Sequence, residues 1–206
     1  MIGLALAIIG IAASQRDLFD EIYERGQKYN AGLKTLTATF TETSTSSLLT
    51  TPLVARGTVT VERPSRVVLR YTEPDKRILL IDADTLTLSW PSAHMHTVTD
   101  IGAAQRRVQK YFVDSSPAEL RGHFQIAARE ASDRPGTYLL TMIPKRKQIQ
   151  QGLKRLDLWI DKTTIMLSAM RMTFPNGDTK LMTFTDVKTN PPIDPSVFTI
   201  DGASGR

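Results

Sequence analysis

The sequence predicts a mainly β fold built around one curved antiparallel sheet of about ten strands, with about three helices. Along most of the chain, segments of strand length alternate apolar and polar residues, and short turns separate them. Two segments, one before the strands and one among them, instead repeat apolar residues at helical spacing. A sheet of this size with a bare apolar face does not lie flat, so we expect it to curl beneath the helices.

The composition is that of a single globular domain: 206 residues, 41% hydrophobic and 23% charged. The absence of cysteine excludes disulfides, thiol catalysis, cysteine–zinc sites and a lipid-modified cysteine. The formal net charge of +5 is compatible with nucleic acid, anionic lipid or an acidic partner, and does not choose among them.

The chain opens with an apolar run of 12 residues, IGLALAIIGIAA, at positions 2–13. This is too short to span a bilayer, which takes about 20 residues, and it suits the core of a signal peptide. We therefore expect residues 1–14 to be a signal peptide and residues 15–206 to form one domain. No Lys or Arg precedes the run, so an uncleaved anchor and a buried N-terminal helix remain alternatives.

The first predicted element after this run is an amphipathic helix over residues 17–36, with a frayed end near Gly32. A Ser/Thr-rich stretch at 43–51 is expected to be a hairpin loop. Strands of the first half are predicted at residues 36–41, 57–63, 66–71, 77–81, 86–90 and 95–99.

Helical spacing returns at residues 101–112, and a short helix is predicted at 118–122, with Ser116 as N-cap and Pro117 at its first position. The sequence Asn176-Gly177 predicts a hairpin turn, because it supplies the positive φ angles that tight turns require. Strands of the second half are predicted at 124–130, 138–143, 156–161, 166–174 and 179–188, and Val197, Phe198 and Ile200 are expected to fix the last segment to the sheet.

The stretch GTVTVERPSRVVLRY, residues 57–71, is the most informative part of the chain. Because strand residues alternate between faces, Val59, Val61 and Arg63 are expected to share one face. Pro64 interrupts the ladder, after which Val67, Leu69 and Tyr71 resume the alternation. A charge beside an apolar row is costly unless it is paired, so Arg63 requires a partner.

Catalysis is not indicated, since neither a G-x-S-x-G elbow nor a phosphate-binding Gly-rich loop occurs. His94 and His96 are two residues apart, which would suit metal ligands on one strand face, but a solvated strand end is the favoured interpretation. We expect no enzyme, no metal and no cofactor.

A basic cluster offers a second candidate site. Its members are Lys145, Arg146, Lys147, Lys154 and Arg155. It contains no aromatic residue on which bases could stack, so we expect no nucleic-acid binding. The alternatives are an anionic membrane surface, an acidic partner, or a plain solvated loop.

The third candidate is an apolar cavity between the curved sheet and its helices. A packed core is the alternative. The many Leu, Met, Val and aromatic positions, together with an arginine on the inner side, favour the cavity.

At this point the chain resembles the periplasmic outer-membrane lipoprotein carrier family, LolA. The resemblance rests on the segments GTVTVERPSRVVLRY, ILLIDADTLTLSWP, DLWID, FTDVKTN and PPIDPSVFTI in this order. Two features depart from the family: Ala83, where a Gly is usual, and the basic loop of residues 145–155. The resemblance implies an unclosed β-barrel with helices as a lid over an apolar cavity, and a monomer located in the periplasm.

The resemblance also implies roles for individual residues. Arg63 would hydrogen-bond the backbone of the lid, between Ile101 and Gly122. The lid would include Val108, Tyr111 and Phe112. The cavity lining is expected to comprise Phe40, Val59, Val61, Val67, Leu69, Tyr71 and Trp90.

The implied cargo is the acyl part of a lipoprotein, received from an inner-membrane transporter and passed to an outer-membrane acceptor. The alternatives are a carrier of another lipid or acyl group, and a sensor or regulator of the same fold that binds a signalling protein.

Overall fold

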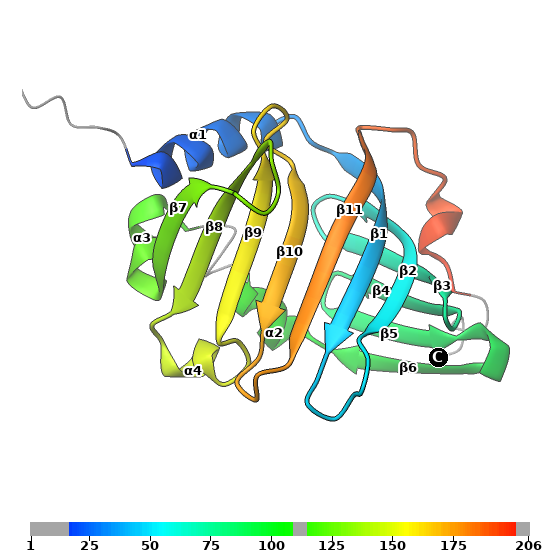
Figure 1. Ribbon diagram of the computed structural model, residues 1–206. Helices are drawn as coiled ribbons and strands as arrows, with labels where there is room; N and C mark the ends of the chain where they lie inside the picture. Colours follow the sequence, from blue (N-terminus) through cyan, green and yellow to red (C-terminus); the bar gives the residue numbers. More distant parts are fainter. Residues whose placement is uncertain (1–16, 109–114, 201–206) are drawn as a thin grey trace, which may run out of the picture.

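The computed structural model describes residues 17–108 and 115–200. Its centre is one antiparallel sheet of eleven strands in the order β6-β5-β4-β3-β2-β1-β11-β10-β9-β8-β7 (Figure 1). Within the described residues the edge strands β6 and β7 do not pair with each other, so the sheet is an open half-barrel. The predicted fold class is confirmed.

The strands coincide with the predicted segments except at the first hairpin, where β1 runs to Thr45, into the predicted loop, and β2 begins at Leu53 and ends at Glu62, before Arg63. They are β1 (Thr35–Thr45), β2 (Leu53–Glu62), β3 (Arg66–Glu73), β4 (Arg77–Asp82), β5 (Thr85–Trp90), β6 (Met95–Asp100), β7 (Phe124–Glu130), β8 (Thr137–Pro144), β9 (Arg155–Asp161), β10 (Leu167–Thr173) and β11 (Thr179–Thr189). The described helical elements are α1 (Leu18–Asn30), α2 (Gly102–Val108), α3 (Pro117–His123), α4 (Lys147–Gln150), η1 (Pro91–Ala93) and η3 (Pro195–Phe198).

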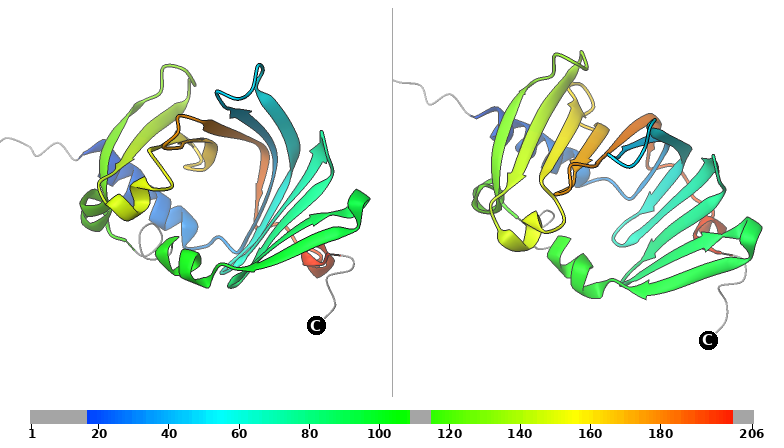
Figure 2. Two further views of the ribbon diagram at one scale, coloured as in Figure 1. Left: turned by 90° about the horizontal axis from the view of Figure 1, so that it is seen from below. Right: turned by 60° about the horizontal axis from the view of Figure 1, so that its bottom comes forward.

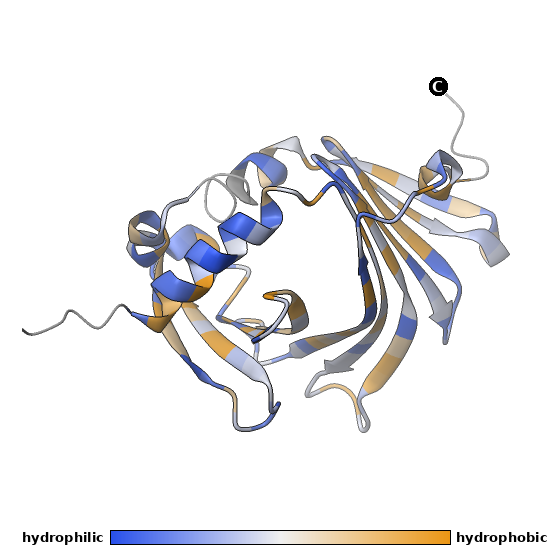
Figure 3. Ribbon diagram, turned by 90° about the horizontal axis from the view of Figure 1, so that it is seen from above, coloured by the Kyte–Doolittle hydropathy of each residue, from blue (hydrophilic) through white to orange (hydrophobic). Residues whose placement is uncertain are grey.

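The helices lie mainly at the open side of the curved sheet. Seen from below, the sheet forms an arch, with α1 beneath the half that contains β7 to β10 and α2 at the opening (Figure 2). From above, α1 crosses the opening with mostly hydrophilic residues on the side in view (Figure 3). In the described part of the chain, no comparable helix packs on the concave face of β1 to β6.

The apolar residues on the concave face form two clusters. Beneath α1, Phe19 and Ile22 pack on Leu140, Met142 and Leu156. On the other half, Phe40, Val59, Tyr71 and their neighbours form the second cluster.

The outer face of β3 and β4 is covered by the C-terminal segment. Phe198 and Ile200 bury Val68 and Leu80, and the Arg66 guanidinium lies 4.7 Å from the centre of the Phe198 ring. The Arg70 guanidinium donates a hydrogen bond to the Val197 carbonyl oxygen at 2.6 Å. The predicted roles of Phe198 and Ile200 in fixing the last segment are therefore confirmed.

The first helix was predicted correctly in kind and wrongly in extent. It ends at Asn30, and Leu36 already lies in β1, because the β alternation of residues 35–45 overrides the helical spacing there. The short helix was predicted correctly, since Ser116 and Glu119 form a capping box with Pro117 at the first position. The helix α4 was not predicted. The hairpin at Asn176-Gly177 is confirmed, but of these two residues only Gly177 has a positive φ, at +92°.

Candidate functional site: the concave face

The predicted lining residues share the concave face of the sheet. In an antiparallel pair, residues directly opposite one another point to the same side. Phe40 is opposite Gly57, Gly57 is opposite Tyr71, and Val59 is opposite Leu69. Val61 is opposite Val67, and Val67 is opposite Ile81. Ile81 is in turn opposite Leu86 on β5, and Trp90, four residues after Leu86, points to the same side. The alternation read from the sequence thus places all seven residues on one surface.

An aromatic pair lies on this surface next to Gly57. The rings of Phe40 and Tyr71 are 4.9 Å apart in an edge-to-face arrangement. A Cβ atom at Gly57 would clash with the Arg70 carbonyl group and lie 2.9 Å from Phe40 Cζ. Glycine therefore allows the β3 backbone and the Phe40 ring to approach β2 closely.

A cavity of about 410 Å³ lies between α1 and the sheet. Apolar residues from α1, α3, β8 and β9 form most of its lining, and Arg63 contributes a charge. None of the seven predicted lining residues belongs to this cavity, so their role as a lining stays a prediction. The apolar members are Phe19, Ile22, Leu120, Leu140, Met142 and Leu158. Its size and mostly apolar lining are those of a site for a small apolar ligand.

Polar contacts hold α1 over this cavity at several points. Arg121 donates hydrogen bonds to Asp20 at 2.7 Å and to Asp17, the N-cap, at 2.6 Å. The pKa of Asp17 is lowered, first by the hydrogen bond from Arg121 and then by that from the Phe19 backbone N–H. Near the middle of the helix, Tyr23 Oη donates to the Ser115 carbonyl oxygen at 2.9 Å.

Arg63 holds the C-terminal end of α1. Its Nη1 donates to the Asn30 carbonyl oxygen at 2.8 Å. The last carbonyl oxygens of a helix have no partner within the helix, and a cation there interacts favourably with the helix dipole. Arg63 therefore both lines the cavity and caps the helix that covers it.

A charged group that was not predicted from the sequence lies on the concave face. We call it the Glu42 cluster: Glu42, Tyr71, Arg77 and Lys180. Glu42 is 5% exposed, accepts a hydrogen bond from Tyr71 Oη at 2.8 Å, and lies 3.0 Å from Lys180 Nζ. Burial, and then the Glu42 carboxylate, raise the pKa of Tyr71 to about 12, so the phenol stays protonated at neutral pH.

The signal for this cluster was present in the sequence, since Glu42 follows Phe40 by two residues and must share its face. Its cationic partners come from other strands, Arg77 from β4 and Lys180 from β11. Only the register of the sheet brings them together.

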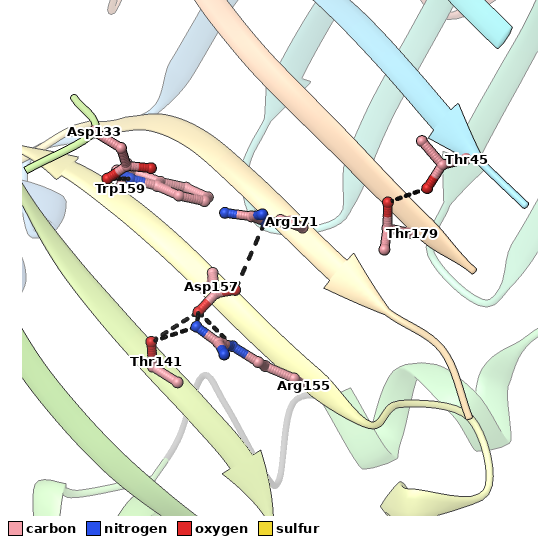
Figure 4. Close-up of polar contacts among 8 residues, drawn as sticks. All are labelled: Thr45, Asp133, Thr141, Arg155, Asp157, Trp159, Arg171 and Thr179. Atoms are coloured by element: carbon pink, nitrogen blue, oxygen red, sulfur yellow. Dashed lines mark hydrogen bonds and ion pairs between the residues drawn. The ribbon is translucent and has the colours of Figure 1, made fainter. Parts of the chain in front are cut away.

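The outer face carries a second buried carboxylate, Asp157 on β9 (Figure 4). It accepts hydrogen bonds from Thr141 Oγ1 at 2.7 Å and Arg155 Nε at 2.9 Å. Two residues along, Trp159 Nε1 donates to Asp133, and Arg171 lies against the indole ring. These contacts stabilise the side of the sheet away from the cavity.

Comparison with known proteins identifies the family. The family model described as outer membrane lipoprotein carrier protein LolA matches residues 31–201. The chain belongs to this family. A curated relative from Cupriavidus taiwanensis, an outer-membrane lipoprotein carrier protein, is 25% identical over 204 residues, covering 94% of this chain and 90% of the relative.

Two solved structures share the fold. An uncharacterised conserved protein from Thermus thermophilus has a TM-score of 0.55 at 11% identity, over 86% of this chain and 90% of that one. MucB in the Pseudomonas aeruginosa MucA/MucB complex has a TM-score of 0.53 at 14% identity, over 88% of this chain and 60% of that one. At these identities the likeness concerns the fold.

The lid that the LolA family implies is described only in part. Val108 is the last residue of α2, and Tyr111 and Phe112 lie outside the described residues. The start of α2 is fixed to the β4–β5 turn, where the Ile101 backbone N–H donates to the Asp84 carbonyl oxygen at 2.7 Å. Ala83 in this turn has φ 47°, which accounts for the family's usual glycine at this position.

The described hydrogen bond of the Arg63 guanidinium goes to α1, whereas the LolA resemblance implied a partner between Ile101 and Gly122. Residues 109–114 of that segment lie outside the described part, so a contact with the lid stays a prediction.

The other two candidate sites from the sequence are made of exposed or internally paired side chains. His94 and His96 are exposed, and within residues 17–108 and 115–200 no group of three or more His, Cys, Asp or Glu could hold a metal. In the basic loop, Lys145 donates to the Arg121 carbonyl oxygen, Arg146 donates to His123 Nδ1, and Arg155 pairs with Asp157. None of the helices in the described part is both long and apolar enough to cross a membrane.

Proposed function

We propose that this protein is a periplasmic carrier that shields the acyl chains of lipoproteins against its concave face and transfers them from the inner to the outer membrane. The observation that carries the proposal is the cavity of about 410 Å³, which is mostly apolar and is covered by a helix held through polar contacts. The family membership, and the lipoprotein-carrier role for which its relatives are named, support lipoprotein as the cargo. The partners would be an inner-membrane transporter and an outer-membrane acceptor.

The energetics suit a carrier. Burying an acyl chain yields roughly 0.8 kcal/mol per methylene relative to water. A membrane offers the chain the same gain, so the net preference of a carrier is small and the chain can be passed on. Polar contacts that hold the cover in place then adjust the balance between empty and occupied forms.

Arg63 is the contact that we propose sets this balance. A hydrogen bond with a charged donor contributes about 1.5 to 3 kcal/mol, and less where it is exposed, as at Arg63. Arg63→Leu removes the bond to Asn30 and frees the end of α1, while the sheet stays intact. We expect unchanged circular dichroism and an altered rate of transfer of a fluorescent acylated peptide from loaded protein to acceptor vesicles.

The matched control is Arg129→Leu, which removes an exposed arginine from the edge strand β7. Transfer by Arg63→Leu at the rate of the wild type would refute the role of Arg63. The cargo itself is tested separately, by mass spectrometry of lipid extracted from protein that was purified from its own periplasm. Recovery of no acylated molecule would count against the carrier function.

A second candidate function is that of a sensor or regulator that binds a signalling protein. The observation that favours it is the fold shared with MucB, whose structure was solved in complex with MucA. Cross-linking in cells to a membrane regulator, with no acyl lipid in the purified protein, would favour this function. A carrier of another lipid would instead yield that lipid in the extract.

A further inference from the structure

The Glu42 cluster places two cations and one carboxylate on an otherwise apolar surface. Arg77 and Lys180 are each about one-third exposed, at 34% and 33%, whereas Glu42 is 5% exposed. With Tyr71 protonated, the cluster carries one positive charge in excess. The apolar residues Phe40 and Met182 lie directly beside it in the sheet.

The two cations differ in how they are held. Lys180 pairs directly with Glu42 at 3.0 Å. The closest approach of the Arg77 guanidinium to that carboxylate is 3.8 Å, and it lies 3.9 Å from the centre of the Tyr71 ring. Stacking, charge and a hydrogen bond to the Tyr71 side chain therefore position the Arg77 guanidinium. Its distance from Glu42 is longer than that of a hydrogen bond, so several of its five N–H donors remain for a ligand.

A guanidinium fixed in this way is suited to a carboxylate, which it can bind through two parallel hydrogen bonds. Stacking on Tyr71 reduces the loss of side-chain entropy on binding. Glu42 neutralises one of the two cations and leaves the charge of the other for a ligand. On the same face, the half-buried Met170 and Met172 of β10 lie between β11 and the cavity and offer contacts for hydrocarbon.

We propose that Arg77, with Lys180 beside it, binds the carboxylate of a long-chain acyl ligand whose hydrocarbon lies along the concave face. This inference rests on the proposed binding of acyl chains to the concave face and goes beyond the lipoprotein cargo, whose attached acyl chains carry no free carboxylate. The geometry assigns the ligand to a chemical class, a single-chain amphiphile with an anionic carboxylate end.

The experiment compares two probes of equal chain length, the naturally fluorescent cis-parinaric acid and its methyl ester, each titrated against the full chain. Arg77→Met removes the charge and keeps much of the length of the side chain. We expect the affinity for the acid to fall about fivefold to tenfold, as loss of a partly exposed charge-assisted bond implies, and the affinity for the ester to stay unchanged. Arg77→Lys keeps the positive charge but loses the two parallel donors of the guanidinium, so its affinity for the acid should lie between those of the wild type and Arg77→Met.

The matched control is Arg56→Met, which removes an arginine from the opposite face of the same half of the sheet, where it pairs with Glu73. The ratio of acid to ester affinity should not change in this variant. The inference would be overturned if Arg77→Met lost affinity for the acid and the ester equally. It would also be overturned if Arg56→Met changed the ratio of the two affinities as much as Arg77→Met does. Neither result would count against the carrier function. Failure of the wild type to bind either probe would also overturn the inference, and the lipoprotein cargo would still be decided by mass spectrometry of the extracted lipid.

Discussion

Glu42 accounts for the positions of three neighbouring side chains. It accepts the hydrogen bond of Tyr71 and lies within 3.8 Å of the two cations of its cluster. A buried carboxylate without partners would cost several kcal/mol, so this group is stable only as a set. Its parts are therefore expected to respond to substitution together.

Glu42→Gln tests this dependence. Glutamine can still accept the hydrogen bond from Tyr71, but it leaves Arg77 and Lys180 without a countercharge. We expect the free energy of unfolding to fall by about 1 to 3 kcal/mol, less than for a fully buried pair because both cations are partly exposed. Urea unfolding measures the change. The control Glu130→Gln, at an exposed position, should stay within about 0.5 kcal/mol of the wild type.

The raised pKa of Tyr71 predicts that the free energy of unfolding falls at alkaline pH. Its pKa in the folded protein is about 12, raised from 10.0 first by burial and then by Glu42. Between these values the unfolded chain releases the proton and the folded chain keeps it, so the contribution of Tyr71 is complete below pH 10 and is lost as the pH rises to 12. Unfolding of the wild type and of Tyr71→Phe across this range measures it. Parallel pH curves for the two proteins would contradict the prediction.

Among the elements, the C-terminal segment around η3 stabilises the sheet from its outer side. Phe198 is 7% exposed and packs against Val68 and Leu80. We expect Phe198→Ala to lower the free energy of unfolding by about 3 to 5 kcal/mol, the usual cost of truncating a buried phenylalanine. Urea denaturation measures it, and Leu48→Ala, at the exposed hairpin tip, is the control. A loss below about 1 kcal/mol would mean that the segment is only loosely attached.

Most elements could be predicted because their signals are local. The alternation of Val67, Leu69 and Tyr71 identifies a strand and its inner face without any partner. By contrast, α4 has four residues in a basic loop with little apolar periodicity. The partner of the Arg63 guanidinium is Asn30, 33 residues earlier, and only the reversal of the chain between α1 and β1 brings them together. Register and chain reversal are properties of the folded chain, which the local sequence does not encode.

At the scale of the whole molecule, the two halves of the concave face are expected to bind different parts of a ligand. The half beneath α1 holds the cavity, and the other half holds the Glu42 cluster. Leu158→Trp should fill the cavity and lower the affinity for the neutral acyl ester about tenfold or more. Val98→Trp, at an exposed position on β6, is the control and should bind normally. Fluorescence titration measures both, and unchanged binding by Leu158→Trp would place the acyl chain elsewhere.

The strand order has a consequence for how the chain folds. β1 to β6 pair with sequential neighbours, as do β7 to β11, whereas the pairing of Thr35–Thr45 with Thr179–Thr189 joins the two ends of the chain. Closing so long a loop is entropically expensive, so local hairpins should form first and this central pairing last. Substitutions of residues at which β1 contacts β11 should then speed unfolding and leave the folding rate almost unchanged. The central pairing of β1 with β11 would thus be the last part of the sheet to form.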